Sequence, residues 1–302
     1  MYEKISIHIA TKDRATEVGL LLQSLRTQTY QNFNIIILDD ASKVPLFNFY
    51  FINYLVNRLK LEGHKVTLLR NNVSAGVSGA RQQLVEYNMK ESKETLFARI
   101  DDDVILEQDF LERMIKVLEK GYDLASGVTT PFNSPDFERE TRFIEPIVNE
   151  CFLDKTGKLK LNMDDCGCCY LNVSKEQIYP AHHFRSCAVY KRSIHEAGID
   201  YKSRLSKHGF REEQIFSFKI LAQGFKIGVD LQANARHLMT PSGGERSTTN
   251  LSQFNQMIFE ETTKKLFEKY GNFIQKYNEM IGIGRRELDL EKYENQLNLA
   301  SK

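Results

Sequence analysis

Neither sign of charge is in surplus in this chain of 302 residues, and no long apolar run is present. With 41 basic and 40 acidic side chains, the formal net charge is +1, which argues against a dedicated nucleic-acid-binding protein. No run approaches the roughly 18–20 apolar residues that a membrane-spanning helix needs. The start, residues 1–4, leads directly into a strand-like pattern and does not resemble a signal peptide. These absences predict a soluble, cytoplasmic protein without a nucleic-acid partner.

Cysteine is also scarce, with five residues and no export signal beside them. The odd number and the expected cytosolic location favour reduced thiols over a disulfide framework. Three of the five form a cluster with two histidines downstream: Cys166, Cys168, Cys169, His182 and His183. The spacing within this cluster differs from the C-x-x-C of structural zinc sites. Buried free cysteines are therefore the favoured interpretation, and a zinc site is the alternative.

Strand-like and helix-like segments alternate regularly through the first half of the chain. Alternating or continuous apolar runs predict strands at 5–9, 35–38, 66–69, 96–100 and 124–128. Apolar stripes with helical spacing predict helices at 18–25, 51–59, 75–89 and 111–118. This order is typical of right-handed βαβ units. The predicted fold class is therefore α/β, with a Rossmann-like, doubly wound and mainly parallel sheet.

The second half has a different pattern from about Thr129 onward. Prolines, a hairpin-like segment at 154–158 and the cysteine cluster predict short strands and loops there. Helical spacing returns at 215–222, followed by a short strand at 226–230, and two more helices are expected at about 251–270 and 272–281. An apolar stripe in the first of these two helices favours packing against the protein's own core, and contact with a membrane surface is the alternative.

Polar side chains follow three of the predicted strands, at the point where each strand ends. They are Thr11 and Asp13, then Asp39 and Asp40, then Asp101, Asp102 and Asp103. In doubly wound sheets the ligand lies outside the carboxyl ends of the strands. Converging carboxylates are costly unless a cation lies between them, and a hard divalent metal that holds a diphosphate meets this need. Solvated loops or helix caps are the structural alternative.

Several separated segments follow one another in an order that is typical of a known enzyme family. They are ISIHIATKDR at 5–14, QTYQNFNIIILDDAS at 28–42, the segment 71–81, IDDD at 100–103, and GFREE at 209–213 with Lys219 and Gly224 beyond it. They resemble the opening strand and turn, the Q-T-Y-x-N-F signature, the N-x-G-x-x-x-A-R-N segment, the D-x-D motif and the E-D helix of the family-two inverting glycosyltransferases with the GT-A fold. The chain departs from this pattern at Ala10, Lys12 and Asp13, and Glu213 and Lys219 replace an Asp and an Arg.

The resemblance implies a division of the chain and a reaction. Residues 1–128 would form the donor-binding half of a GT-A domain, 129–240 its acceptor and catalytic half, and 241–302 a C-terminal helical extension. The implied reaction is the metal-dependent, inverting transfer of a sugar from a nucleotide-diphosphate sugar, UDP-linked, to an acceptor hydroxyl. The acceptor would be a glycan, a lipid-linked molecule or a protein. A lipid-linked acceptor would bring the enzyme to the inner face of the membrane.

The resemblance also implies roles for individual residues. Glu213 is the expected base that deprotonates the acceptor hydroxyl, and Glu212 is the alternative. Asp103, Asp101 and His237 are the expected ligands of Mn²⁺ or Mg²⁺, because carboxylate oxygens suit these ions better than zinc. The expected donor-binding residues are Thr11, Asp13, Asp39, Asp40, Arg81, Asp101 and Asp102.

Each of these roles has a structural alternative. Adjacent acids in the first turn of a helix can serve only to complement the helix dipole. Asp39 could cap the helix that follows it, a reading that leaves Asp40 without a role. Arg81 could be a surface arginine on a helix, and a single histidine such as His237 is more often structural than functional.

Two other function classes remain open. A nucleotidyltransferase uses a similar sheet and metal-bound carboxylates, but the turn at 10–14 has no glycine of the kind that holds a triphosphate. A non-catalytic scaffold that kept the fold is the other alternative. The presence of Asp101, Asp103 and Glu213 together argues against it.

Overall fold

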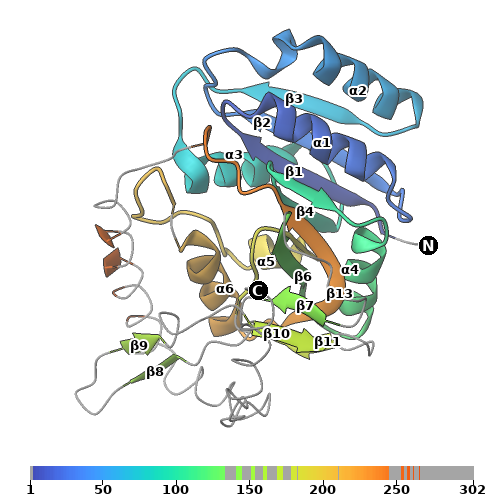
Figure 1. Ribbon diagram of the computed structural model, residues 1–302. Helices are drawn as coiled ribbons and strands as arrows, with labels where there is room; N and C mark the ends of the chain where they lie inside the picture. The colour runs from blue at the N-terminus through green and yellow to red at the C-terminus, as the bar shows by residue number, and fades with distance from the viewer. Residues whose placement is uncertain are drawn as a thin grey trace, which may run out of the picture.

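The structure is a computed structural model that describes residues 3–132, 141–144, 151–153, 159–161, 169–172, 178–181, 183–209, 211–244, 253–254, 257–258, 261 and 265. Within these residues the centre is a sheet of nine strands in the order β11-β13-β6-β12-β4-β1-β2-β3, with β5 paired to β13 (Figure 1). No helix in this described part is long and apolar enough to cross a membrane.

The first half of the chain supplies a block of four parallel strands. They are β1 (Ile5–Thr11), β2 (Phe33–Asp39), β3 (Val66–Arg70) and β4 (Leu96–Asp101). The register pairs Thr11 with Asp39 and Ala10 with Asp101. The polar residues at the carboxyl ends of β1, β2 and β4 therefore lie at the same edge of the sheet, as the sequence predicts.

The second half completes the sheet with strands of both directions. β12 (Ala188–Lys191) is antiparallel to β4 and to β6 (Leu124–Pro131), and β13 (Ile227–His237) is parallel to β6. β5 (Val104–Leu106) and β11 (Ile178–Pro180) are antiparallel to β13. The sequence pattern does not predict β12, whose four residues, AVYK, show no alternation of apolar and polar side chains. It also ends β13 too early, since the strand continues to His237.

Two short antiparallel pairs lie outside the main sheet: β7 (Thr141–Ile144) with β10 (Cys169–Asn172), and β8 (Cys151–Leu153) with β9 (Leu159–Leu161). The β8–β9 pair flanks the predicted hairpin turn at 154–158. That turn, Cys166, Cys168 and the predicted helix at 272–281 lie outside the described residues, as does most of the predicted helix at 251–270. Cys187 is a free, buried thiol, as expected for a reduced protein.

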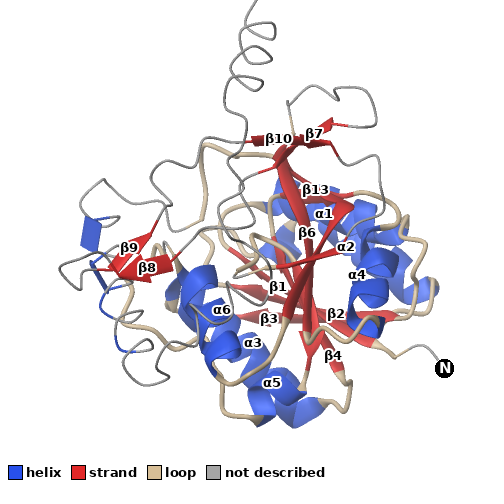
Figure 2. Cartoon of the chain, turned by 90° about the horizontal axis from the view of Figure 1, so that it is seen from below, coloured by secondary structure: helices blue, strands red, loops and turns tan. Residues whose placement is uncertain are grey.

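Helices cover both faces of the sheet, which confirms the doubly wound α/β class (Figure 2). One face carries α1 (Ala15–Arg26), α2 (Tyr50–Leu61) and α4 (Phe110–Glu119), and the 3₁₀ turn η1 (Leu46–Asn48) precedes α2. The other face carries α3 (Gly76–Glu91), α5 (Ser193–Glu196) and α6 (Glu212–Ala222). The chain crosses to the second face where it returns from β3 at the edge to β4, because right-handed crossovers in opposite directions lie on opposite faces.

The continuous apolar run in β2 follows from this double cover. Ile35 and Ile37 belong to the core under α1 and α2, whereas Ile36 and Leu38 pack with Ala80 and Leu84 of α3. Successive side chains of a strand point to opposite faces, so a strand buried on both faces needs apolar residues at every position.

A buried histidine in β1 is expected to make the fold sensitive to acid. His8 is 3% exposed, and its ring centroid lies 5.1 Å from that of Phe97. Burial is the main cause that lowers the pKa of His8 from 6.5 to about 3, and the charges of His195 and Arg81 act in the same direction. Between pH 6.5 and about 3, His8 is therefore protonated in the unfolded chain but neutral in the folded protein. The free energy of unfolding falls as the pH decreases through this range.

We expect His8→Phe to remove this contribution, because phenylalanine keeps the packing and does not titrate. The difference in free energy of unfolding between pH 7 and pH 4 should then be smaller than in the wild type by roughly 3 kcal/mol, at 1.36 kcal/mol per pH unit. Urea unfolding at the two pH values measures it. Equal losses in the two proteins would contradict the assignment.

Candidate active site

A cavity of about 610 Å³ opens at the carboxyl ends of β1 and β4 and reaches the start of α6. Nine of the eleven residues predicted to be catalytic, donor-binding or metal-ligating line it: Thr11, Asp40, Arg81, Asp101, Asp102, Asp103, Glu212, Glu213 and His237. Asp13 and Asp39 do not line it. The cavity therefore joins residues from both halves of the chain.

Asp102 is held by the turn that follows β1. Thr11 Oγ1 donates to Asp102 Oδ2 at 2.8 Å, and Arg14 Nη1 lies 2.9 Å from both Asp102 Oδ1 and Asp103 Oδ2. Burial raises the pKa of Asp102 to about 6, although the charge of Arg14 opposes this shift. These contacts tie the acidic segment to the β1 turn and fix where the neighbouring carboxylates point.

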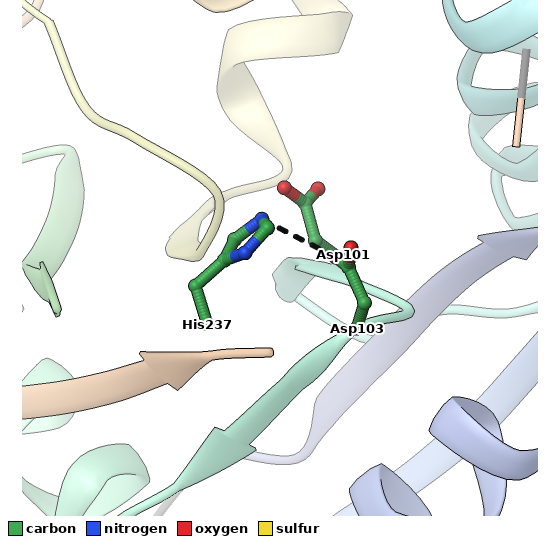
Figure 3. Close-up of side chains that lie close together, drawn as sticks. All are labelled: Asp101, Asp103 and His237. Carbon is green, nitrogen blue, oxygen red and sulfur yellow. Dashed lines mark ion pairs between the residues drawn. The ribbon is translucent and has the colours of Figure 1, made fainter. Parts of the chain in front are cut away.

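Asp101, Asp103 and His237 converge on one point, with one ligand atom from each within 4.8 Å of the others (Figure 3). Pairing of β13 with β5 places His237 opposite Val104, next to Asp103. His237 Nε2 lies 3.4 Å from Asp103 Oδ1, and the backbone N–H of Met239 donates to His237 Nδ1 at 2.9 Å. Two carboxylates suit Mn²⁺ or Mg²⁺, and an imidazole favours the transition metal, so this donor set fits Mn²⁺.

A cluster of buried charges connects this group to α6. Arg99, whose side chain is 2% exposed, places Nη2 2.6 Å from Glu212 Oε1, 3.0 Å from Glu213 Oε1 and 3.5 Å from Asp101 Oδ1. Arg81 Nε lies 3.2 Å from Glu212 Oε1, and Arg81 Nη2 pairs with Asp101. Burial would raise the pKa of Asp101, but the two guanidinium groups outweigh it and lower that pKa.

The two acids at the start of α6 differ in their surroundings. Glu212 is 4% exposed and lies between Arg81 and Arg99, yet burial outweighs these cations and raises the pKa of Glu212. The side chain of Glu213 is 21% exposed, and within the described part of the chain it forms an ion pair with Arg99 alone. Both line the cavity, but Glu213 is the more open to a molecule inside it.

Asp39 and Asp40 are occupied by contacts within the protein. Asp39 accepts the backbone N–H groups of Ser42 at 2.8 Å and Leu46 at 2.9 Å, and it pairs with Arg70. Asp40 binds the loop before α3 with both oxygens: it accepts from the N–H groups of Ala75 and Gly76 and from the side chains of Asn71 and Ser74. The contacts of Asp39 agree with its structural alternative, and Asp40 has a structural role of its own, which that alternative had not included.

Asp13 also contacts the protein rather than the cavity. Its carboxylate accepts the N–H of Lys43 at 2.7 Å, and its own N–H donates to Ser42 Oγ at 2.8 Å. Its φ of +55° lies in the left-handed region. Asp13 thus joins the β1 turn to the loop after β2.

Comparison with known proteins decides the family. Residues 6–178, more than half of the chain, match the family described as Glycosyl transferase family 2. The chain belongs to this family. An uncharacterized glycosyltransferase of Haemophilus influenzae is 29% identical over 119 residues, which is 38% of this family-2 chain and 35% of that protein. The match therefore spans about a third of the length of this relative.

Solved structures support the same fold. Residues 1–349 of S. aureus TarS match with a TM-score of 0.50 at 12% identity, over 77% of this chain and 60% of that one. GalNAc-T7, solved with UDP, GalNAc and Mn²⁺, matches with a TM-score of 0.57 at 13% identity, over 99% of this chain and 58% of that one. These structures confirm the predicted GT-A type of fold, and the family match over residues 6–178 confirms the predicted glycosyltransferase family.

The sequence interpretation of this family-2 chain missed four arginines that line the cavity: Arg14, Arg99, Arg185 and Arg211. Arg14 ends the ISIHIATKDR segment, and Arg99 interrupts an otherwise apolar strand, so both carried a signal. A charge inside a buried strand requires a partner. Arg185 lies in a loop where no period or motif marks it.

Proposed function

We propose that this protein is a metal-dependent, inverting glycosyltransferase that moves a sugar from a nucleotide-diphosphate sugar, UDP-linked, to an acceptor hydroxyl. The observation that carries the proposal is the presence of two groups in one cavity. Asp101, Asp103 and His237 fit a divalent ion on one side, and Glu213 presents a carboxylate on the other. GalNAc-T7, which shares the fold, was solved with UDP and Mn²⁺, and this supports the choice of donor and ion.

The metal-binding group would hold the donor by its diphosphate. A bound Mn²⁺ supplies Lewis-acid stabilisation of the charge on the leaving phosphate. Arg14 fixes Asp103 from the side of β1, and Arg81 fixes Asp101 from the side of α3. The ligands are thus held in place by charged partners, which is what precise coordination requires.

Glu213 would act as the base. In an inverting transfer the acceptor hydroxyl attacks the anomeric carbon on the face opposite the leaving group, and its proton must pass to a nearby acceptor atom. Arg99 Nη2 contacts Glu213 Oε1 at 3.0 Å, which leaves Oε2 for the hydroxyl. Glu212, enclosed by two arginines, is better suited to holding them in place than to receiving a substrate proton.

We also propose a division of the chain. Residues 1–128 form the donor-binding half, to which His237 of the second half contributes a metal ligand. Residues 129–240 form the acceptor and catalytic half, and residues 241–302 form a helical extension. The acceptor is a glycan, a lipid-linked molecule or a protein. A lipid-linked acceptor would place the enzyme at the inner face of the membrane.

Calorimetric titration with UDP and other nucleoside diphosphates tests the donor class. We expect one diphosphate to bind in Mn²⁺, more weakly in Mg²⁺ and not in EDTA. Asp103→Asn should weaken this binding about 10–100-fold, the usual effect of disturbing metal coordination. The control is Asp109→Asn, which makes the same change at a carboxylate outside the cavity and should bind as the wild type does. Absence of binding for every diphosphate in the wild type would favour a scaffold protein instead.

A further inference from the structure

The loop that leads into β12 contributes to the cavity between the metal-binding group and the start of α6. Arg185 and Ser186 line the cavity, whereas Phe184, the residue before them, is buried and 2% exposed. Phe184 packs edge-on against Phe216, with ring centroids 6.3 Å apart. The buried phenylalanine anchors the loop, and the half-buried arginine beside it faces the cavity.

The backbone holds Arg185 in place through a tight turn at Ser186. The N–H of Cys187 donates to the carbonyl of Arg185 at 2.6 Å, and Ser186 has a φ of +57°. A left-handed conformation is costly for serine, and such strain concentrates at functional sites. Two side chains of β6 secure the turn. Ser126 donates to the carbonyl of Cys187 at 2.6 Å, and Thr129 donates to that of Arg185 at 3.3 Å.

The same turn is connected to the metal-binding group. The side chain of Ser186 hydrogen-bonds Asp101. The charges of Glu213 and Asp101 act to raise the pKa of Arg185, and the charge of Arg185 acts to lower the pKa of His237. Arg185 therefore lies near both the expected ion and the expected base. Burial lowers the pKa of Arg185, but arginine remains charged in proteins. In the proposed reaction, the bond to the leaving phosphate breaks in the space between these groups.

The charge of the cavity wall also favours an anionic ligand. The lining residues include six basic side chains (Lys12, Arg14, Arg81, Arg99, Arg185 and Arg211) and six acidic ones (Asp40, Asp101, Asp102, Asp103, Glu212 and Glu213). A divalent ion would therefore leave the wall with two positive charges. A nucleoside diphosphate carries the complementary charge.

We propose that Arg185 is a further catalytic residue, which contacts the donor diphosphate and stabilises the charge that develops on it. As the bond from the anomeric carbon to the phosphate oxygen breaks, its electron pair stays on that oxygen. The acceptor oxygen forms the new bond, and its proton passes to Glu213. The guanidinium fork of Arg185 donates to the phosphate oxygens, a geometry that suits arginine. The assignment rests on the proposed function.

The test compares the binding of a diphosphate with that of the same nucleoside without phosphate. Each is titrated calorimetrically in Mn²⁺, with the nucleoside diphosphate that binds the wild type best. We expect Arg185→Gln to weaken diphosphate binding about 10–100-fold and to leave nucleoside binding unchanged, as befits the loss of charge-assisted hydrogen bonds. Arg185→Lys keeps the charge but not the guanidinium fork, so its affinity for the diphosphate should lie between those of the wild type and of Arg185→Gln.

The controls separate a local contact from a general effect of charge or folding. Arg204→Gln removes a cation from the surface outside the cavity, where the side chain is 75% exposed, and should not change diphosphate binding. Thermal unfolding checks that each variant is folded. If Arg185→Gln does not fold, Arg185→Lys is compared with the wild type instead. An equal loss in Arg204→Gln, or wild-type affinity in both Arg185 variants, would overturn the role of Arg185 while the proposed function stands. If the wild type binds no diphosphate, the proposed function itself fails.

Discussion

Glu213→Gln is expected to slow sugar transfer about 10²–10⁴-fold, the usual contribution of a positioned base. Glutamine has the size of glutamate and can still accept from Arg99 Nη2, but it cannot take a proton from the acceptor. Binding of the nucleoside diphosphate should therefore be unchanged. The rate is measured as release of nucleoside diphosphate from the nucleotide sugar, and the binding by calorimetry.

Two further variants make this test specific. Glu213→Asp keeps a base but withdraws it by about one methylene, so an intermediate rate is expected. Glu86→Gln makes the same change on α3, at a side chain that is 54% exposed and outside the cavity, and should leave the rate unchanged. If Glu213→Gln transfers at the wild-type rate and Glu212→Gln does not, Glu212 is the base.

Arg99→Met is expected to destabilise the protein by about 3–5 kcal/mol, the cost of removing one partner from a buried ion pair. Methionine fills the space of the arginine stem but leaves Glu212, which is 4% exposed, with Arg81 as its one remaining ion-pair partner within the described residues. Urea unfolding measures the loss. Arg58→Met is the control, because Arg58 is 59% exposed and its pair with Glu62 on α2 should contribute less than about 1 kcal/mol.

A double variant shows whether the loss comes from the stranded carboxylate. Arg99→Met together with Glu212→Gln removes both charges, so it should be more stable than Arg99→Met alone. A single variant within about 1 kcal/mol of the wild type would show that Arg99 is not needed for the balance of charge in this cluster. The transfer rate of Arg99→Met, measured separately, shows whether the contact of Arg99 with Glu213 Oε1 also positions that carboxylate, because a loss of stability without a loss of rate would show that it does not.

The parallel half of the fold could be read from the sequence because its signals are local. The apolar run Ile35 to Leu38 indicates a strand, and the acidic segment after β4 marks the end of one. Both signals lie within a few residues. β12 could not be found in this way, since its residues show no clear strand pattern and it is held in the sheet by strands more than fifty residues away. Its direction depends on its neighbours and not on its own pattern.

The candidate site could also be predicted only in part, because some of its contacts join residues that are far apart in the sequence. The acidic residues Asp101 and Asp103 at the end of a strand indicate a candidate metal site from the sequence alone. The partner of Arg99 at Glu212 lies more than a hundred residues further along the chain, and only the folded structure brings the two together. The structural role of Asp40 could not be predicted for the same reason. Asp40 contacts the loop before α3, about 35 residues further along the chain, so its neighbours in the sequence do not reveal this role.

The hydrogen bond from Met239 to His237 links the candidate metal-binding group, Asp101, Asp103 and His237, to the backbone that follows β13. Because Nδ1 accepts this bond, the neutral imidazole must carry its proton on Nε2, the nitrogen that faces Asp103. An ion at Nε2 would require the other tautomer, with the proton on Nδ1, and Nδ1 could then no longer accept from Met239. Met239 has a φ of +52°, so its turn is strained and this bond helps to hold it.

The chain beyond Met239 runs back to the β1 turn, where the carbonyl of Ser242 accepts from Arg14 and the N–H of Gly244 donates to Lys12. The tautomer of the His237 ring is therefore coupled to the path of residues 239–244 along the rim of the cavity.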